Sequence, residues 1–335
     1  MAKRDIVVIG GSLGAADVLK AVLPTLPADY PASVFVVTHV PINGIKMLGQ
    51  TLSRMCALPV SYPEDGEPIA TSRIYIAPPD RHLLVTDGAI RLGVGSKENM
   101  ARPAIDPLFR SAALAFGPRV IGVLLSGLLN DGASGLAAIK HCGGVALVQD
   151  PDTARAPDMP MAAVDEGYAD HVLGVDELAK ALASLAGTDA DEHVCPPDDL
   201  VLDVEIALGE RLGSGRLRQI ADPVAISCPT CQGVLSEIRA SHPLRFRCQT
   251  GHAFTSGALV EAQEEAVEQA LRVALRVIEE RVELVDRLRR EAEKVGRGGV
   301  SEIYRQRTAE YSGYAQTLRQ ASTALLHLKH TDESR

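Results

Sequence analysis

One serine stands on a turn whose residues suit a nucleophile. Residues 6–9 are apolar and predict a buried strand, and Gly10-Gly11-Ser12-Leu13-Gly14 then leads into residues typical of a helix. The glycines permit a tight turn that lifts the Ser12 hydroxyl above the sheet and leaves room for a substrate carbonyl. The N–H of Leu13 lies at the expected helix start, where it can face a developing oxyanion. The stretch therefore predicts a nucleophile for acyl transfer.

A phosphate-binding loop is the alternative for a glycine-rich turn after a first strand. The dinucleotide pattern G-x-G-x-x-G does not fit residues 10–14, and the chain has no G-K-[ST] there for a P-loop. A serine nucleophile also needs a base, and an acid that orients the base.

His39 and Asp131 are the base and acid that the strand pattern favours. His39 follows a second buried strand around residues 34–37, and Asp131 lies in the glycine-rich loop after a long strand at 120–125. Ligands and catalytic groups of parallel sheets gather at the carboxyl ends of the strands, so Ser12, His39 and Asp131 are expected to converge. His39 would take the hydroxyl proton as Ser12 attacks an acyl carbon, and Asp131 would fix the tautomer of His39. The chain order Ser…His…Asp differs from that of the α/β-hydrolases, but geometry defines a triad.

Other residues compete for these roles. His39 could simply end its strand, and Asp131 could cap a turn or a helix. Asp80 and Asp150 also follow strands and are rival acids. The rival bases are His82, His141 and His171.

A second cluster has the spacing of a metal site. Cys228 and Cys231 form C-x2-C, and Cys248 and His252 form C-x3-H. Four such ligands complete a tetrahedral zinc shell and leave no open position, so the site would be structural. The alternatives are reduced cysteines in a metal-free hairpin, or a redox pair. His193 and Cys195 are weaker candidates for the same site.

The surrounding pattern predicts the elements that position these groups. Strands alternate with helical stretches over 5–186, which indicates an α/β domain with a mostly parallel, doubly wound sheet. Residues 187–222 are polar and acidic and predict a linker, and 223–256 hold the expected zinc knuckle. Apolar stripes at steps of three and four over 257–330, broken by Gly296, Gly298 and Gly299, predict a helical hairpin or half of a coiled-coil dimer.

Bulk properties narrow the function classes. The chain has 335 residues, of which 46% are hydrophobic, enough for a sizeable core. The net charge of −9 argues against general nucleic-acid binding. No apolar run reaches membrane-spanning length and residues 1–5 do not suit a signal peptide, so a cytoplasmic protein without membrane insertion is expected.

Residues 5–186 resemble the catalytic domain of the CheB family, the chemotaxis protein-glutamate methylesterases. The resemblance lies in the Ser12 turn, His39-Val40-Pro41, and three further stretches: 101–109, 127–135, and Gln149-Asp150-Pro151 with Met159-Pro160. It implies that Ser12, His39 and Asp131 are nucleophile, base and acid, without a catalytic cofactor. It also implies hydrolysis of glutamyl methyl esters on the cytoplasmic helices of methyl-accepting chemoreceptors, and deamidation of receptor glutamines.

Departures from the family pattern concern the site's surroundings. The resemblance places Leu13, Leu128 and Arg102 around the oxyanion and an acidic receptor segment. The family commonly has Thr where this chain has Leu13, and Gly-Met-Gly where it has Gly127-Leu128-Leu129. The strand that begins near Asp5 leaves no room for the family's N-terminal receiver domain, so another form of control is expected. A catalytically weak scaffold in receptor signalling is the alternative function, with the knuckle and hairpin as binding or dimerisation elements.

Overall fold

A computed structural model describes residues 2–39, 42–191, 198–210, 213–239, 241 and 243–332 of the protein. The chain divides into two compact units, Met1–Leu259 and Val260–Arg335. Within the described residues, no helix combines the length and the apolar character that a membrane span requires.

A seven-stranded sheet forms the centre of the first unit, in the order β3-β4-β2-β1-β7-β8-β9. Every pairing in it is parallel. The strands are β1 (Ile6–Gly11), β2 (Ser33–Thr38), β3 (Val60–Ser61), β4 (Arg73–Ile76), β7 (Val120–Leu124), β8 (Val145–Gln149) and β9 (His171–Leu173). The middle strands are continuous apolar runs because both faces of the sheet are covered. The predicted parallel, doubly wound sheet is confirmed.

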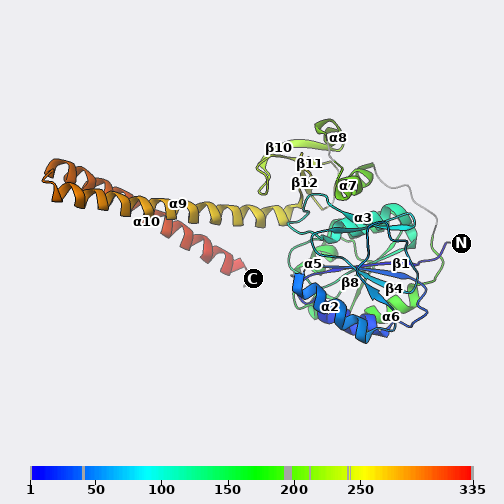
Figure 1. Cartoon of the computed structure of the whole chain (residues 1–335). Helices are drawn as coiled ribbons and strands as arrows, with labels where there is room; N and C mark the ends of the chain where they lie inside the picture. Colours follow the sequence, from blue (N-terminus) through cyan, green and yellow to red (C-terminus); the bar gives the residue numbers. More distant parts are fainter. Residues whose placement is uncertain are drawn as a thin grey trace. The chain divides into compact units, whose positions relative to one another are not determined.

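Helices cover both faces of this sheet (Figure 1). One layer contains α1 (Ala15–Val22), α2 (Ile42–Met55) and α6 (Val175–Leu185), and the other contains α3 (Ile105–Phe116), α4 (Ala133–His141) and α5 (Asp158–Asp165). Side chains of β1 alternate between two aliphatic clusters, with Val7 and Ile9 in one and Ile6 and Val8 in the other. Three short 3-10 turns complete the layers: η1 (Leu23–Thr25), η2 (Gly117–Arg119) and η3 (Pro151–Thr153).

The stretch expected to be a linker, 187–222, contains folded elements. The helix α7 (Asp198–Leu208) packs on α3 and on the hairpin formed by β5 (His82–Thr86) and β6 (Ala89–Gly93), and α8 (Ser214–Ile220) follows it. Leu202, Val204 and Ile206 of α7 are buried. The acidic composition of the stretch hides this apolar side of the helix, which is why the sequence pattern predicted connecting chain only.

A small antiparallel sheet lies in the segment expected for the knuckle. Its strands pair in chain order: β10 (Ala221–Ser227), β11 (Val234–Ile238), β12 (Arg245–Cys248) and β13 (Ala253–Thr255). We call residues 221–255 the small sheet. Two tight connections in it carry the expected metal ligands, one between β10 and β11 and the other between β12 and β13.

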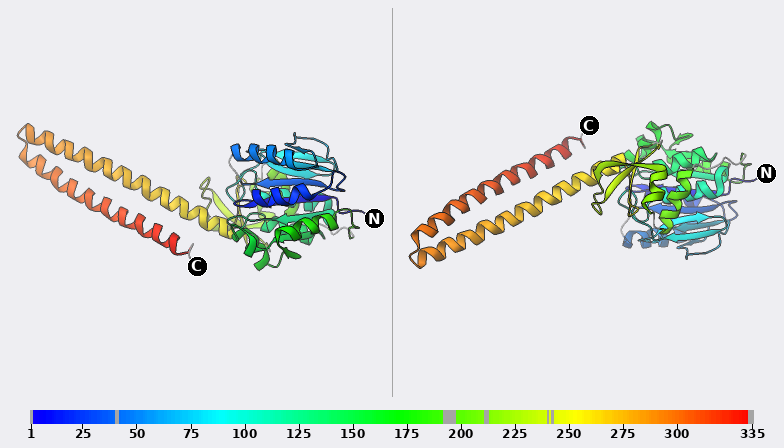
Figure 2. Two further views of the ribbon diagram at one scale, coloured as in Figure 1. Left: turned by 90° about the horizontal axis from the view of Figure 1, so that it is seen from below. Right: turned by 90° about the horizontal axis from the view of Figure 1, so that it is seen from above.

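Two long helices follow, α9 (Ser256–Lys294) and α10 (Gly298–Asp332), which return alongside each other as an antiparallel hairpin (Figure 2). The chain reverses at residues 295–297, where Gly296 has a left-handed φ of 74°. Arg319 of α10 pairs with Glu279 of α9, and the Arg281 guanidinium lies 5.6 Å from the centre of the Tyr311 ring. The predicted helical C-terminal region is therefore present.

Candidate active site

Ser12 stands on the turn between β1 and α1. Its N–H donates to the carbonyl of Ser126 (2.9 Å), and its own carbonyl accepts from the N–H of Ala15 (3.1 Å). The Ser126 hydroxyl also donates to the carbonyl of Leu13 (2.7 Å), so the loop after β7 fixes the turn at two points. Gly14 has φ 89°, a left-handed conformation that favours glycine. This geometry leaves Ser12 half-buried at the carboxyl end of the central strand.

His39 and Asp131 meet at the same end of the sheet. The strand register pairs Gly11 with Thr38, and the N–H of His39 donates to the Gly11 carbonyl (3.3 Å), so His39 and Ser12 follow neighbouring strand ends. The Nε2 atom of His39 lies 2.9 Å from Oδ2 of Asp131. If His39 acts as the base, Nδ1 is the ring nitrogen left to receive the serine proton. Among the described residues, the Ser12 hydroxyl makes no hydrogen bond to the ring, a gap that substrate binding commonly closes in hydrolases.

Asp131 is buried and surrounded by donors. The N–H of Ile105 donates to its Oδ2 (2.7 Å), and the amide of Asn99 and the N–H of Asp106 donate to its Oδ1 (2.9 and 3.3 Å). Burial alone would raise the pKa of Asp131, but the contact with His39 and these donors outweigh burial and lower it to about 2. Asp131 therefore stays charged near neutral pH, as an acid that orients a histidine must.

A second buried carboxylate supports this loop from below. Oδ1 of Asp106 accepts from the N–H groups of Gly132 (3.1 Å) and Gly135 (2.6 Å), and Oδ2 accepts from Asn99 (3.0 Å). Burial and the nearby charge of Asp131 raise the pKa of Asp106 to about 7. The sequence reasoning gave Asn99 and Asp106 no role. Asp106 lies within the matched stretch 101–109, where an acid at a helix start was an available signal, whereas Asn99 carried none.

The N–H of Leu13 is available at the start of α1. It has no hydrogen-bond acceptor within the described residues, and the Leu13 side chain is exposed. In the loop after β7, Gly127 has little room for a side chain, because a Cβ there would lie 2.6 and 2.7 Å from Cε and Sδ of Met159 and 3.0 Å from Cβ of Ser12. Leu128 is exposed, and Leu129 has φ 60°. Leu129 thus takes a glycine-like backbone conformation at the position where the family pattern has glycine, at some cost in strain.

Arg102, expected to hold an acidic substrate segment, is already paired. Its guanidinium donates twice to Oδ1 of Asp80 (3.0 and 2.7 Å) and once to the Gly95 carbonyl (2.8 Å). This pairing also accounts for Asp80, one of the rival acids. An acidic substrate would have to compete with Asp80 for the guanidinium.

The structure gives the other candidate bases and acids no contact with the Ser12 turn among the described residues. His82 is fully buried, its Nε2 lies 3.0 Å from the Ser96 carbonyl, and its Nδ1 accepts from the N–H of Ala104 (3.3 Å). Burial lowers the pKa of His82. Asp150 caps its own 3-10 turn through Asp152. His141 and His171 are exposed and distant in sequence from the Ser12 turn.

The four expected metal ligands come together in the small sheet. Cys228, Cys231, Cys248 and His252 offer ligand atoms that all lie within 4.8 Å of one another. Sγ of Cys231 lies 3.6 Å from Sγ of Cys248, and Nδ1 of His252 lies 3.5 and 3.9 Å from Sγ of Cys248 and Cys228. A tetrahedron with Zn–S bonds of about 2.3 Å has edges of about 3.8 Å. The donor set therefore fits zinc, whereas His193 and Cys195 lie outside the described residues.

Comparison with known proteins gives one consistent result. The CheB methylesterase family matches residues 7–182. A protein-glutamate methylesterase/protein-glutamine glutaminase 2 from Anaeromyxobacter dehalogenans is 42% identical over 184 residues, which cover 55% of this chain and 54% of that protein. This chain thus spans about half the length of that relative. A putative protein of the same name from Leptospira interrogans is 35% identical over 182 residues, 54% of this chain and 94% of that protein.

A solved structure agrees with the sequence comparison. The Thermotoga maritima CheB methylesterase catalytic domain superposes with a TM-score of 0.53 at 35% identity, over 56% of this chain and 100% of that domain. The family match over residues 7–182 includes Ser12, His39 and Asp131 and almost all of the seven-stranded sheet. The chain belongs to the CheB methylesterase family.

Proposed function

We propose that the protein is a serine hydrolase that removes methyl esters from glutamate side chains of methyl-accepting chemoreceptors and deamidates receptor glutamines. The observation that carries the proposal is the contact of 2.9 Å between His39 and a charged, buried Asp131, beside a serine held on a strand-to-helix turn. The names of the family's members supply the substrate class. The cytoplasmic helices of the receptors are the proposed partners.

The proposed reaction uses only side chains and water. Ser12 Oγ attacks the ester carbonyl carbon while Nδ1 of His39 takes the hydroxyl proton, and the N–H of Leu13 stabilises the oxyanion. Collapse of this intermediate breaks the bond to the methoxy group, which leaves as methanol with the proton from His39. Water then attacks the acyl-enzyme and releases glutamate and free Ser12. For a glutamine side chain the leaving group is ammonia. No catalytic cofactor is required for either reaction.

We propose that zinc binds Cys228, Cys231, Cys248 and His252 and has a structural role. Four protein ligands leave no open position for catalysis. The spacing of the ligand atoms and their tight backbone turns support this assignment: the N–H of Cys228 donates to Gly233 (2.7 Å), and the N–H of Cys248 donates to His252 (3.0 Å). Metal content of the purified protein and of a Cys228→Ser variant tests it, with about one zinc per chain expected only for the former.

The hairpin is proposed as a homodimer interface. What supports it is that Val273, Leu284 and Ile303 remain exposed on the hairpin of a single chain. Sedimentation of the native protein and of a Leu284→Lys variant tests this proposal. A dimer that dissociates in the variant is the expected result, and a native monomer would contradict it.

Methanol release tests the enzymatic proposal. Membranes that contain methyl-labelled chemoreceptors are incubated with native protein, with Ser12→Ala and with a known methylesterase as positive control. Release by the native protein and none by Ser12→Ala is the expected result. Failure of the native protein on receptors that the positive control hydrolyses would contradict the proposed substrate.

A further inference from the structure

We propose that the small sheet positions the triad acid. In this proposal Thr255 holds Asn99, Asn99 holds Asp131, and the metal keeps the small sheet in the register that this requires. The inference rests on the proposed function, because it assumes that the Ser12–His39–Asp131 triad performs catalysis. It makes Asn99 a positioning residue and the metal a determinant of turnover.

Asn99 lies on a turn with an unusual backbone. Asn99 and Met100 both have left-handed φ values, 47° and 64°, between Glu98 and Ala101, whose backbones exchange hydrogen bonds of 3.2 and 2.9 Å. This is the geometry of a two-residue hairpin turn, which asparagine tolerates at its first position and which usually has glycine at the second. Methionine at the second position strains the turn. External contacts must therefore help to hold it.

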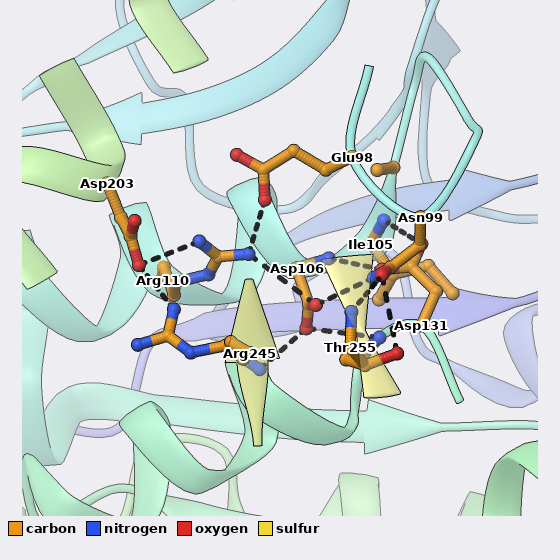
Figure 3. Close-up of polar contacts among 12 residues, drawn as sticks. Glu98, Asn99, Ile105, Asp106, Arg110, Asp131, Asp203, Arg245 and Thr255 are labelled. Atoms are coloured by element: carbon orange, nitrogen blue, oxygen red, sulfur yellow. Dashed lines mark hydrogen bonds and ion pairs between the residues drawn. The ribbon is translucent and has the colours of Figure 1, made fainter. Parts of the chain in front are cut away.

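The small sheet supplies those contacts. The N–H of Asn99 donates to the Ala253 carbonyl, and the N–H of Thr255 donates to Oδ1 of Asn99, both at 2.9 Å. The second bond determines which way the Asn99 amide faces, because Oδ1 accepts from Thr255 and Nδ2 must then point the other way. Nδ2 donates to Oδ1 of Asp131 and to Oδ2 of Asp106, as the close-up shows (Figure 3).

Buried charges hold the neighbouring residue, Glu98, in the same way. Glu98 is 1% exposed and pairs with Arg247 of β12 (3.1 Å) and with Arg110 of α3 (2.5 Å). Asp203 of α7 completes the network by pairing with Arg247 (2.7 Å), with Arg110 (2.9 Å) and with Arg245. Because one lost partner would leave a buried charge uncompensated, this arrangement resists separation of the small sheet from the domain.

Two metal ligands are sequence neighbours of the residues that contact the turn at Glu98 and Asn99. Cys248 directly follows Arg247, and His252 directly precedes Ala253. A metal that joins Cys248 and His252 therefore fixes the connection between β12 and β13, and β13 ends in Thr255. His252 and Thr255 are thus three residues apart in the chain. Two hydrogen bonds, from Thr255 to Asn99 and from Asn99 to Asp131, complete the connection from the metal site to the triad.

The test compares full-length variants in methanol release and in the rate of Ser12 phosphonylation by a fluorophosphonate. Asn99→Gly removes the bridge and keeps the left-handed backbone, and Asn99→Asp keeps the shape but replaces the amide donor by a carboxyl group beside Asp131 and Asp106. Ser96→Ala is the matched control, because the Ser96 hydroxyl donates to the Thr250 carbonyl of the small sheet (2.8 Å) without reaching Asp131. Each protein is assayed with zinc and after removal of zinc by a chelator.

Asn99→Gly and Asn99→Asp are expected to lower kcat and the phosphonylation rate about 10-fold to 100-fold, with KM within about twofold of native, because misplacement of a catalytic group by about 1 Å has effects of this size. Ser96→Ala should keep the native kcat. Zinc removal should lower kcat in the native protein and change it little further in Asn99→Gly, and added zinc should restore it.

Two results would overturn the inference: native rates in both Asn99 variants, or zinc removal that lowers the rate by the same factor with and without Asn99. If receptors are not hydrolysed by the native protein, the proposed substrate fails, and the phosphonylation rates still decide the inference.

Discussion

The small sheet and the helical hairpin both carry many charges, but they use them differently. In the small sheet, Arg247 is fully buried, and its partners Glu98 and Asp203 lie 149 and 44 residues away in the chain. In the hairpin, pairs such as Arg276 with Glu280 are four residues apart and mostly exposed, at 67% and 62% of their side-chain surface. The first arrangement joins distant segments, whereas the second stabilises single helices.

The two kinds of ion pair should therefore contribute differently to the free energy of unfolding. Exposed pairs one helical turn apart contribute only about 0.3–0.5 kcal/mol each and are screened by salt. Loss of one partner of a buried ion pair costs much more, because the remaining ion has lost its hydration and depends on that partner. The small sheet is therefore expected to unfold together with the catalytic domain, whereas hairpin helicity depends on its own sequence.

The largest expected effect is that of Arg247→Ala. It leaves Glu98 and Asp203 buried with fewer partners, so the free energy of unfolding should fall by about 3–5 kcal/mol. Urea unfolding followed by near-UV circular dichroism measures it. A loss below about 1 kcal/mol would show that the network is dispensable.

Removal of zinc comes next. A metal that binds only the folded state stabilises it by about 3 kcal/mol when free zinc exceeds its Kd about 100-fold. Thermal unfolding with added zinc and with a chelator should therefore differ for the first unit, and Cys228→Ser should behave like the chelated protein. A metal-independent melting temperature would contradict a structural site.

Acid should destabilise the first unit below about pH 4. Asp131, with a pKa of about 2 in the fold and about 3.9 unfolded, contributes roughly 2–3 kcal/mol that is present above pH 4 and is lost as pH falls through 2. The arginines around Glu98 and Asp203 also outweigh burial and lower the pKa of both carboxyls, so these act in the same direction. Asp106 acts in the opposite direction above about pH 3, because its raised pKa lets the folded state bind a proton at a higher pH than the unfolded chain does; below about pH 3 it is protonated in both states, and the three lowered carboxyls outnumber it throughout. Unfolding free energies between pH 5 and 2 should fall accordingly, and a flat profile would contradict these ion pairs.

The smallest effect belongs to the hairpin. Arg276→Ala removes one exposed pair with Glu280 and should cost no more than about 0.5 kcal/mol, less at high salt. Far-UV circular dichroism during thermal unfolding measures it, with Arg247→Ala as the matched buried change. A cost comparable to that of Arg247→Ala would erase the distinction between the two regions.

The sequence predicted those features that short stretches of residues encode. The apolar run at residues 6–9, the glycines around Ser12 and the C-x2-C spacing are local patterns, and the strand-end rule then brought His39 and Asp131 to one edge of the sheet. The Asn99–Thr255 link and the Glu98–Arg247 pair join residues 156 and 149 positions apart, and no periodicity or spacing predicts them. The buried side of α7 was not predicted, because acidic residues such as Asp203 suggested an exposed segment. In the fold, Asp203 is buried and pairs with arginines from other elements.

Covalent labelling tests the central claim most directly. Native protein, Ser12→Ala and His39→Gln are treated with a fluorophosphonate, and the modified residue is located by peptide mass spectrometry. A single adduct on Ser12, absent in Ser12→Ala and formed far more slowly in His39→Gln, is the predicted result. An adduct on another residue, or equal rates with and without His39, would contradict the assignment of Ser12, His39 and Asp131 as a catalytic triad.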